Sequence, residues 1–464
     1  MLTLPQTKTH AEDAFWPRRM LPMGLAVFSL SLVALFLLFY TFPNNYDSFF
    51  FSLDPRGMQQ FRAHLGLEGL PHLGFRAFSR AYRLLLVLLW GGYALTLFAC
   101  LRGARLSMRA VLAAIVLAGV VTAVFAPPLL SSDVYANISH GRIFVLYGHN
   151  PYLWLPRGLG AVHDPVEPFL VWDVPTVYGP VWTWIEVGVV ALFRSAGVWT
   201  QVVALKLLLA GALLVTALAG RRLAARLSPG RENLVFLAIG LNPLLLLEGP
   251  GTAHNDLAFF SLLMVGVMFY FDKKYVAAAL CLGLSVGIKP LTLALLPWAL
   301  LDYSRGRNWR QALTGAVVAT ALVLLPLALL FIPFWRGTET LAAMQQRSKF
   351  QQTHALASHA LLVFVYLALS VWLLKWRREG QWLTAWALFS IALMFLLLVP
   401  IFPWYIIWFW PICLLRWDRW HPGLSTACLA LSLVWMIGYG MISPGKPLQG
   451  HWWINMDGTT SPHR

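Results

Sequence analysis

The sequence has few charged residues, and acidic ones are the scarcer kind. Only 12% of its 464 residues are charged, with 35 Lys+Arg against 19 Asp+Glu, whereas 59% are hydrophobic. Soluble globular domains carry about 25% charged and about 45–50% apolar residues. This shortage of charge excludes a water-soluble fold and a disordered chain, and it favours one polytopic membrane domain.

Cysteine and the common cofactor motifs are also scarce or absent. The four cysteines lie in or at the ends of apolar runs without CxxC spacing, which predicts buried small side chains rather than disulfides or a thiolate metal site. GxxxxGK[ST], GxGxxG, DxD and HExxH are all missing. These absences argue against ATP-driven chemistry, hydride transfer and the use of a nucleotide sugar. We expect no cofactor and no metal site.

Long apolar runs recur between Met23 and Met441. Because a run of about 20 residues crosses the hydrocarbon core, they predict an all-α integral membrane protein with about 11–13 transmembrane helices. Many basic residues lie in short turns between runs, as the positive-inside rule and anionic headgroups require, so we expect no nucleic-acid partner. With these turns in the cytosol, the longer segments 42–82, 131–176 and 335–359 face outside.

Two places do not fit a simple alternation of spans. Two apolar runs, Val181–Phe193 and Val202–Leu218, follow the outer segment 131–176, although the orientation requires an odd number of crossings there. Either one run is re-entrant or interfacial, or the distribution of basic residues misleads. The second place is Gly287-Ile288-Lys289-Pro290, where proline breaks the helix and lysine at membrane depth is costly. Two half-helices that meet at the outer surface would account for both residues.

The most concentrated polar stretch, residues 131–142, directly follows an expected span. It contains Asp133, His140 and Arg142 at the outer surface of the membrane. Asp133 stands where a substrate dissolved in the lipid could meet one from water. A capping aspartate on an ordinary loop helix explains it about as well.

Further polar groups also allow both a functional and a structural interpretation. Glu186 lies inside an apolar run after Tyr178-Gly179-Pro180 and needs a partner or a cavity, whereas the aromatic residues beside it fit an interfacial belt. The segment 248–256 gathers Glu248, His254 and Asp256, which favours a site over a helix-terminal charge. Lys289 suits a phosphate or snorkels to the surface, and the aromatic turn 402–405 suits a site or a belt.

Five blocks then resemble a known family in their order along the chain. They are SSDVYANISHGRIFVLYGHNPY, VYGPVW, LNPLLLLEGPGTAHND, GLSVGIKPLTLALLPW and FPWYIIWFWP, between residues 131 and 411. Together they resemble the GT-C glycosyltransferases, and among these the polyprenol-phosphate-mannose-dependent mannosyltransferases of bacterial membranes. The resemblance implies a GT-C-like transmembrane catalytic domain over residues 21–443, with the catalytic aspartate in the outer loop 131–176. We expect residues 1–20 to form a cytosolic tail and residues 444–464 a tail outside.

The resemblance implies an inverting transfer from a lipid-phosphate sugar on the outer face, with Asp133 as the catalytic base. One acid stands at this position where many GT-C enzymes have an acidic pair. A departing phosphate needs cationic groups, and the candidates are Lys289, Arg142 and His254. The candidates for binding sugar hydroxyls or the acceptor are Tyr178, Asp256, Glu186 and His140.

We therefore expect a hexosyltransferase of the bacterial inner membrane that moves a hexose, mannose by resemblance, to a glycan or glycolipid acceptor. Its partners are the polyprenyl-phosphate sugar donor, that acceptor and membrane lipids. The alternatives are a transporter or flippase for lipid-linked sugars, which would also use broken helices and buried charges, and an oligosaccharide polymerase or ligase. The clustering of polar residues at one face, without paired halves, argues against a transporter.

Overall fold

The structure is a computed structural model, and helices make up nearly all of the part it describes. It describes residues 10–41, 62–63, 65–127, 131, 133–155, 164–167, 170, 174–340, 342–343, 356–375, 379–398, 402–415, 430, 453–454 and 460–461. The all-α fold class is confirmed, because the strands within these residues are only the two-residue β1 (Trp453–Ile454) and β2 (Thr460–Ser461). They pair antiparallel, with Trp453 opposite Ser461.

Within the residues that the structure describes, six helices are long and apolar enough to cross a membrane, and a bent pair adds a seventh. The six are α1 (His10–Phe39), α3 (Phe75–Leu101), α4 (Met108–Phe125), α7 (Val198–Leu227), α13 (Trp309–Phe331, which continues into the 3-10 turn η5, Ile332–Phe334) and α15 (Leu356–Lys375). The bent pair joins α8 (Glu232–Gly240) to α9 (Pro243–Leu246) and the π-helical turn η3 (Leu247–Gly251), with a 45° bend.

The remaining helices are shorter. They are α5 (Asp133–Val145), α6 (Pro180–Leu192), α10 (Asp256–Phe271), α11 (Tyr275–Val286), η4 (Pro290–Leu295), α12 (Leu296–Tyr303), α16 (Gln381–Leu397), η6 (Pro403–Trp408) and α17 (Trp410–Cys413). The 11–13 spans expected from hydropathy exceed the six or seven found by length and composition. Hydropathy registers every apolar run but not its helical length, and the expected span 424–441 lies almost wholly outside the described residues.

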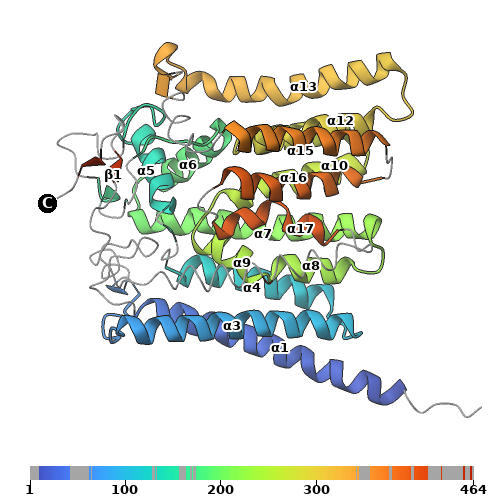
Figure 1. The fold of residues 1–464 in the computed structure, drawn as a ribbon. Coiled ribbons are helices and arrows are strands. Elements are labelled where there is room, and N and C mark those ends of the chain that lie inside the picture. The colour runs from blue at the N-terminus through green and yellow to red at the C-terminus, as the bar shows by residue number, and fades with distance from the viewer. Residues whose placement is uncertain are drawn as a thin grey trace, which may run out of the picture.

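The crossing problem after the outer segment has a structural answer. Helix α6 has 13 residues, a length of about 20 Å, which is short of the roughly 30 Å hydrocarbon core. It packs against α5 at one end of the bundle (Figure 1), whereas α7 has 30 residues and is long enough to cross. By helix length this stretch thus contains one candidate span, which agrees with the odd number of crossings that the orientation requires. Lys206, inside α7, is buried and donates to the carbonyl of Ala126 at the end of α4.

The two ends of the bundle differ in chemistry. The C-terminal ends of α3, α7, α12 and α15 lie at one end of the bundle, opposite α5 and α6 (Figure 1). Ion pairs join the last turns of α7 to neighbouring segments: Arg222 lies 2.9 Å from Asp272, directly after α10, and Arg226 lies 2.5 Å from Glu379, just before α16. In the described residues the basic turns thus share one end, as the positive-inside pattern requires. Arg347, Lys349 and His354 of the segment 335–359 lie outside the described residues.

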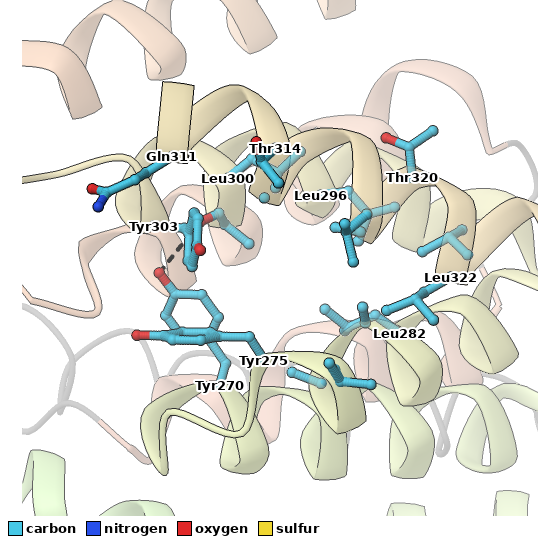
Figure 2. Close-up of a pocket in the computed structure, with 18 of the residues that line it drawn as sticks. Tyr270, Tyr275, Leu282, Leu296, Leu300, Tyr303, Gln311, Thr314, Thr320 and Leu322 are labelled. Carbon is cyan, nitrogen blue, oxygen red and sulfur yellow. Dashed lines mark hydrogen bonds between the residues drawn. The ribbon is translucent and has the colours of Figure 1, made fainter. Parts of the chain in front are cut away.

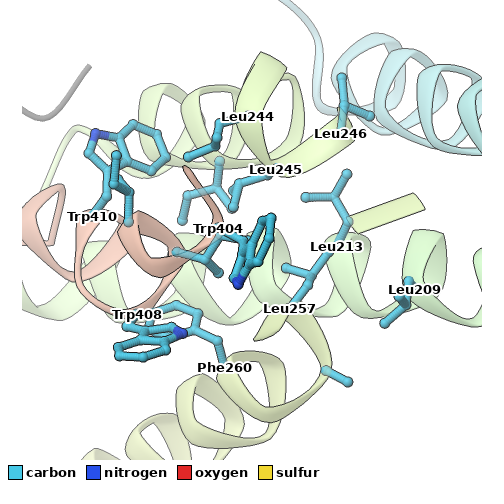
Figure 3. Close-up of a cluster of buried hydrophobic side chains, with 14 of the residues drawn as sticks. Leu209, Leu213, Leu244, Leu245, Leu246, Leu257, Phe260, Trp404, Trp408 and Trp410 are labelled. Atoms are coloured by element: carbon cyan, nitrogen blue, oxygen red, sulfur yellow. The ribbon is translucent and has the colours of Figure 1, made fainter. Parts of the chain in front are cut away.

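A large apolar core packs between the helices next to the candidate site. Figure 3 shows side chains from α7, α9 and α10 around the tryptophans of η6 and α17, among them Leu213, Leu245, Phe260, Trp404 and Trp408. All five belong to one buried cluster. The core fixes the position of η6, whose tryptophans contact the polar residues of the site.

We predict that the end of the bundle with α5 and α6 faces outside and the end with the basic turns faces the cytosol. Single cysteines at Ser131 and at exposed Arg102, in a cysteine-free background, should react with an impermeant maleimide from opposite sides of intact cells. Labelling of both positions from the same side would contradict this orientation.

Candidate functional site

The helix break expected at Gly287-Ile288-Lys289-Pro290 is confirmed. Helix α11 ends at Val286 and the 3-10 helix η4 begins at Pro290. The hydroxyl groups of Ser285 and Thr292 lie 2.7 Å apart across the break, and both are buried. This bridge holds the extended residue Lys289 between two helical segments.

The segment with Tyr178-Gly179-Pro180 is paired directly with this break. The Gly179 amide donates to the Ile288 carbonyl at 3.1 Å, and the Val181 amide donates to the Gly287 carbonyl at 2.9 Å. A Cβ atom on Gly179 would lie 2.3 Å from the Gly287 oxygen, so only glycine permits this approach. The pairing carries Tyr178 to Lys289, whose ammonium lies 5.8 Å from the centre of its ring.

Lys289 forms an ion pair with the first residue of α10. Its Nζ lies 2.7 Å from Oδ1 of Asp256, and the indole N–H of Trp408 donates to the same oxygen at 2.5 Å. Asp256 is buried, while 17% of the Lys289 side chain is exposed. Each of the two charges therefore has a partner, and a ligand can still reach the exposed side of the ammonium.

Local strain places His254 next to Glu248. The π-helical turn η3 ends at Gly251, and Ala253 then takes a φ of 60°, which is unusual for a residue other than glycine. Both irregularities are frequent at functional sites. Together they reverse the direction of the chain, so that the His254 amide donates a hydrogen bond to the Glu248 carbonyl at 3.0 Å.

The imidazole of His254 lies between two carboxylates. Its Nδ1 is 3.0 Å from Oε2 of Glu248, and its Nε2 is 3.5 Å from Oδ2 of Asp133. The ring stacks on Trp404 with centroids 3.8 Å apart. His254 and Glu248 are buried, whereas 29% of the Asp133 side chain is exposed. Asp133 is thus the carboxylate of this group that a ligand can reach.

The neighbouring carboxylates favour the protonated form of His254. Burial disfavours the imidazolium, but the hydrogen bond and charge of Glu248, with the charges of Asp133 and Asp256, outweigh burial and raise the pKa of His254. Burial, assisted by the nearby carboxylates, raises the pKa of Tyr178 well above its ordinary value. Tyr178 therefore stays protonated and can donate a hydrogen bond.

Four of the five sequence blocks thus contribute contacts to one site with Asp133, and the VYGPVW block joins it by pairing with the helix break. Its residues come from the start of α5, the segment before α6, the turn between η3 and α10, the helix break and η6. Sequence reasoning left Trp404, in the aromatic turn 402–405, open as a member of a site or of a belt, and it did not single out Trp408. The structure places both against site residues. Thr252, whose hydroxyl lies 2.9 Å from Nδ1 of His254, carried no sequence signal.

Arg142 lies apart from the Asp133 group. Its Nε donates to both oxygens of Asp164, at 3.0 and 2.9 Å, and its Nη1 donates to Gln201 at 3.1 Å. Tyr147 donates to the same carboxylate at 2.5 Å. All the contacts that the structure gives for the Arg142 guanidinium therefore tie α5 to α7 and to the outer segment.

Glu186 and His140 form a separate buried pair between α6 and α5. Oε1 of Glu186 lies 3.7 Å from Nδ1 of His140, and the other ring nitrogen contacts the Val174 carbonyl at 3.0 Å. The partner that an acid inside an apolar helix requires is therefore His140. Neither oxygen of Glu186 has a hydrogen-bond partner within the described residues.

Known proteins that are similar to this chain are mannopyranosyltransferases by name. A family model described as "Alpha-(1->6)-mannopyranosyltransferase, N-terminal domain" matches residues 57–305, more than half of the chain. Alpha-(1->6)-mannopyranosyltransferase A of Mycobacterium tuberculosis is 27% identical over 287 residues, which cover 58% of this chain and 53% of that protein. The Corynebacterium glutamicum protein with that name is 30% identical over 186 residues, 39% of this chain and 36% of its own length.

The chain thus spans about half the length of the first relative and about a third of the second. No solved structure matches the chain.

Proposed function

Since the chain belongs to the alpha-(1->6)-mannopyranosyltransferase family, a family of glycosyltransferases, we propose that it is a multi-pass mannosyltransferase. Mannose moves from a polyprenyl-phosphate donor to a glycan or glycolipid acceptor. The reaction takes place at the outer face of a bacterial inner membrane, in the domain 21–443, and requires no cofactor.

One observation carries this proposal: an accessible carboxylate and an accessible ammonium share one site, each held by buried partners. Asp133 is backed by His254 and Glu248, and Lys289 is backed by Asp256. An acceptor hydroxyl needs a base and a departing phosphate needs a cation. Transfer of a sugar from a phosphate to a hydroxyl requires the base and the cation in the same site.

In the proposed step, a carboxylate oxygen of Asp133 takes the proton of the acceptor hydroxyl. The hydroxyl oxygen attacks the anomeric carbon, the bond from that carbon to the phosphate oxygen breaks, and its electron pair leaves with the phosphate. The attack inverts the anomeric carbon. An α-(1→6) linkage, which the names of the relatives state, then requires a donor with a β-linked phosphate and an acceptor with a free 6-hydroxyl.

Lys289 stabilises the departing phosphate while Asp256 keeps the ammonium in position. His254 contributes the second positive charge, because its raised pKa favours the imidazolium next to Asp133. The Tyr178 hydroxyl binds a sugar hydroxyl, whereas Asp256, which is buried, acts through Lys289 and not on the sugar. Arg142 serves the site indirectly, by holding α5 through Asp164, and the His140–Glu186 pair holds α5 against α6.

The overall proposal is tested by transfer in proteoliposomes. Purified protein with radiolabelled polyprenyl-phosphate mannose and cell-envelope glycolipid extract should yield labelled product with release of polyprenyl phosphate. Movement of the donor across the bilayer without product would instead identify a flippase. Transfer of a preassembled oligosaccharide, with no transfer of single mannose units, would identify a polymerase or ligase.

Asp133→Asn should lower the transfer rate by about 10²–10⁴-fold, the usual contribution of a general base. Asparagine caps a helix as well as aspartate, so the amount of folded protein and donor binding should not change. The matched control is Asp272→Asn, which removes an acid from a surface ion pair at the opposite end of the bundle. Near wild-type turnover of the Asp133 variant would eliminate this residue as the base.

Lys289→Gln should raise the KM for the donor about tenfold or more, since a charge-assisted hydrogen bond is worth about 1.5–3 kcal/mol. Part of the effect arises because Asp256 loses its partner, and the double variant Lys289→Gln/Asp256→Asn separates the two causes. Lys274→Gln, in the turn at the other end, is the control. A donor KM that stays unchanged in the Lys289 variant argues against a phosphate site here.

Glu248→Gln should move the alkaline limb of the pH–rate profile to lower pH. The Glu248 carboxylate favours the imidazolium of His254, so removing its charge lowers the pKa of His254 and the ring loses its proton earlier as pH rises. Initial rates of transfer between pH 6 and 9 measure the shift. A variant that is slower at every pH, with an unmoved limb, would mean that Glu248 only supports the local structure.

A further inference from the structure

We propose that a cavity between α11, α12 and α13 binds one acyl chain of an anionic phospholipid, whose phosphate contacts Arg310. The cavity (Figure 2) has a volume of about 590 Å³, and its lining includes Tyr303 and Arg310, which flank the turn with Arg305 and Arg307. None of its lining residues belongs to the Asp133 site. This inference is therefore independent of the proposed transfer reaction.

The cavity is apolar along most of its length. Its walls include Ala278 and Leu282 of α11, Leu296 of α12, and Val318 and Leu322 of α13. A polar molecule that entered this cavity would lose its hydrogen bonds to water, and few side chains of the lining could replace them. A flexible hydrocarbon chain fills the space at no such cost.

One wall of the cavity, α13, is little covered by the rest of the protein. Only 6% of the apolar window of the span 309–334, which contains α13, is buried by protein, against 44% for α7. A lipid chain already dissolved in the bilayer can therefore enter beside α13 without crossing water. This lateral access favours a membrane lipid over a ligand from solution.

The tyrosines of the cavity gather at one end. Figure 2 shows Tyr270, Tyr275, Tyr303 and Gln311 together, with Leu282 and Leu322 towards the other end, where Thr320 is the polar residue labelled. This arrangement suits an amphiphile whose headgroup lies beside the tyrosines and Gln311 and whose acyl chain extends towards Leu282 and Leu322.

The start of α13 marks the level of the headgroups. Trp309 is 69% exposed, and tryptophan favours the interface between membrane and water. Arg310 follows it and lines the cavity. The headgroup layer therefore coincides with the end of the cavity that holds the tyrosines.

Arg310 is the cation available to a phosphate here. The neighbouring Arg307 is engaged: it donates to the Tyr303 carbonyl and the Tyr275 hydroxyl, and it lies 3.9 Å from the centre of the Tyr303 ring. Arg310 lies 5.5 Å from the centre of the Trp309 ring and has no carboxylate partner in the described part of the chain. Its charge is complementary to an anionic headgroup.

The test uses the full-length protein in nanodiscs with phosphatidylglycerol that carries a diazirine near the end of one acyl chain. Irradiation and peptide mapping should place the label on lining residues of α11, α12 or α13. Phosphatidylcholine with the same diazirine, at the same mole fraction, should label them about tenfold less, a difference of about 1.4 kcal/mol in affinity. Equal labelling by both lipids would overturn the proposal.

Two pairs of variants locate the site. Ala319→Trp fills the cavity and should abolish labelling of its walls, whereas Val317→Trp, at a 60% exposed position of the same helix, should not. Arg310→Gln, a surface change that leaves the fold intact, should reduce labelling by phosphatidylglycerol to the level of phosphatidylcholine. Arg102→Gln, at another exposed arginine of this end, should leave it unchanged.

Failure of Arg310→Gln to reduce labelling, or labelling of the walls that survives in folded Ala319→Trp, would overturn the assignment. Polyprenyl phosphate that displaces the lipid at a lower mole fraction would assign the cavity to a prenyl chain instead. Transfer activity is not the readout, so these outcomes do not depend on the proposed function.

Discussion

Two backbone hydrogen bonds, from Gly179 to Ile288 and from Val181 to Gly287, hold the start of α6 against the break between α11 and η4. The approach is possible because neither Gly179 nor Gly287 has a side chain. Lys289, next to the pairing, is directed to Asp256, and Tyr178 is carried to Lys289. The geometry of the phosphate side of the site depends on this contact between segments more than a hundred residues apart.

Charge pairing governs the rest of the site. A charged group inside a membrane protein is costly unless it has a partner, and the buried charges of the site are arranged accordingly. Asp256 has Lys289, and His254 has carboxylates on both sides. The pairing also leaves a consistent asymmetry: in each group one charge stays accessible while its partners are buried. A pre-organised carboxylate and ammonium can then act on a substrate without rearrangement.

The two ends of the bundle contain different kinds of residues. One end gathers α5, α6 and the polar site, and the other gathers the basic turns joined by ion pairs such as Arg226–Glu379. Between the ends, α13 and α15 are little covered by the rest of the protein. Under the proposed function, the lipid-linked donor approaches the site from the bilayer around these helices.

The sequence by itself determined the membrane class, the helical fold, the helix break at Lys289 and the blocks that contain the site residues. The class, the fold and the break follow from local properties, namely hydropathy, proline and the scarcity of charge, whereas the blocks were found through the resemblance to a family. Only the tertiary structure decided that His254 lies between Glu248 and Asp133 and that Arg142 is engaged by Asp164. Each of these depends on contacts between segments distant in the chain, such as Trp408 with Asp256. No local pattern encodes such contacts, because packing of the whole bundle brings the partners together.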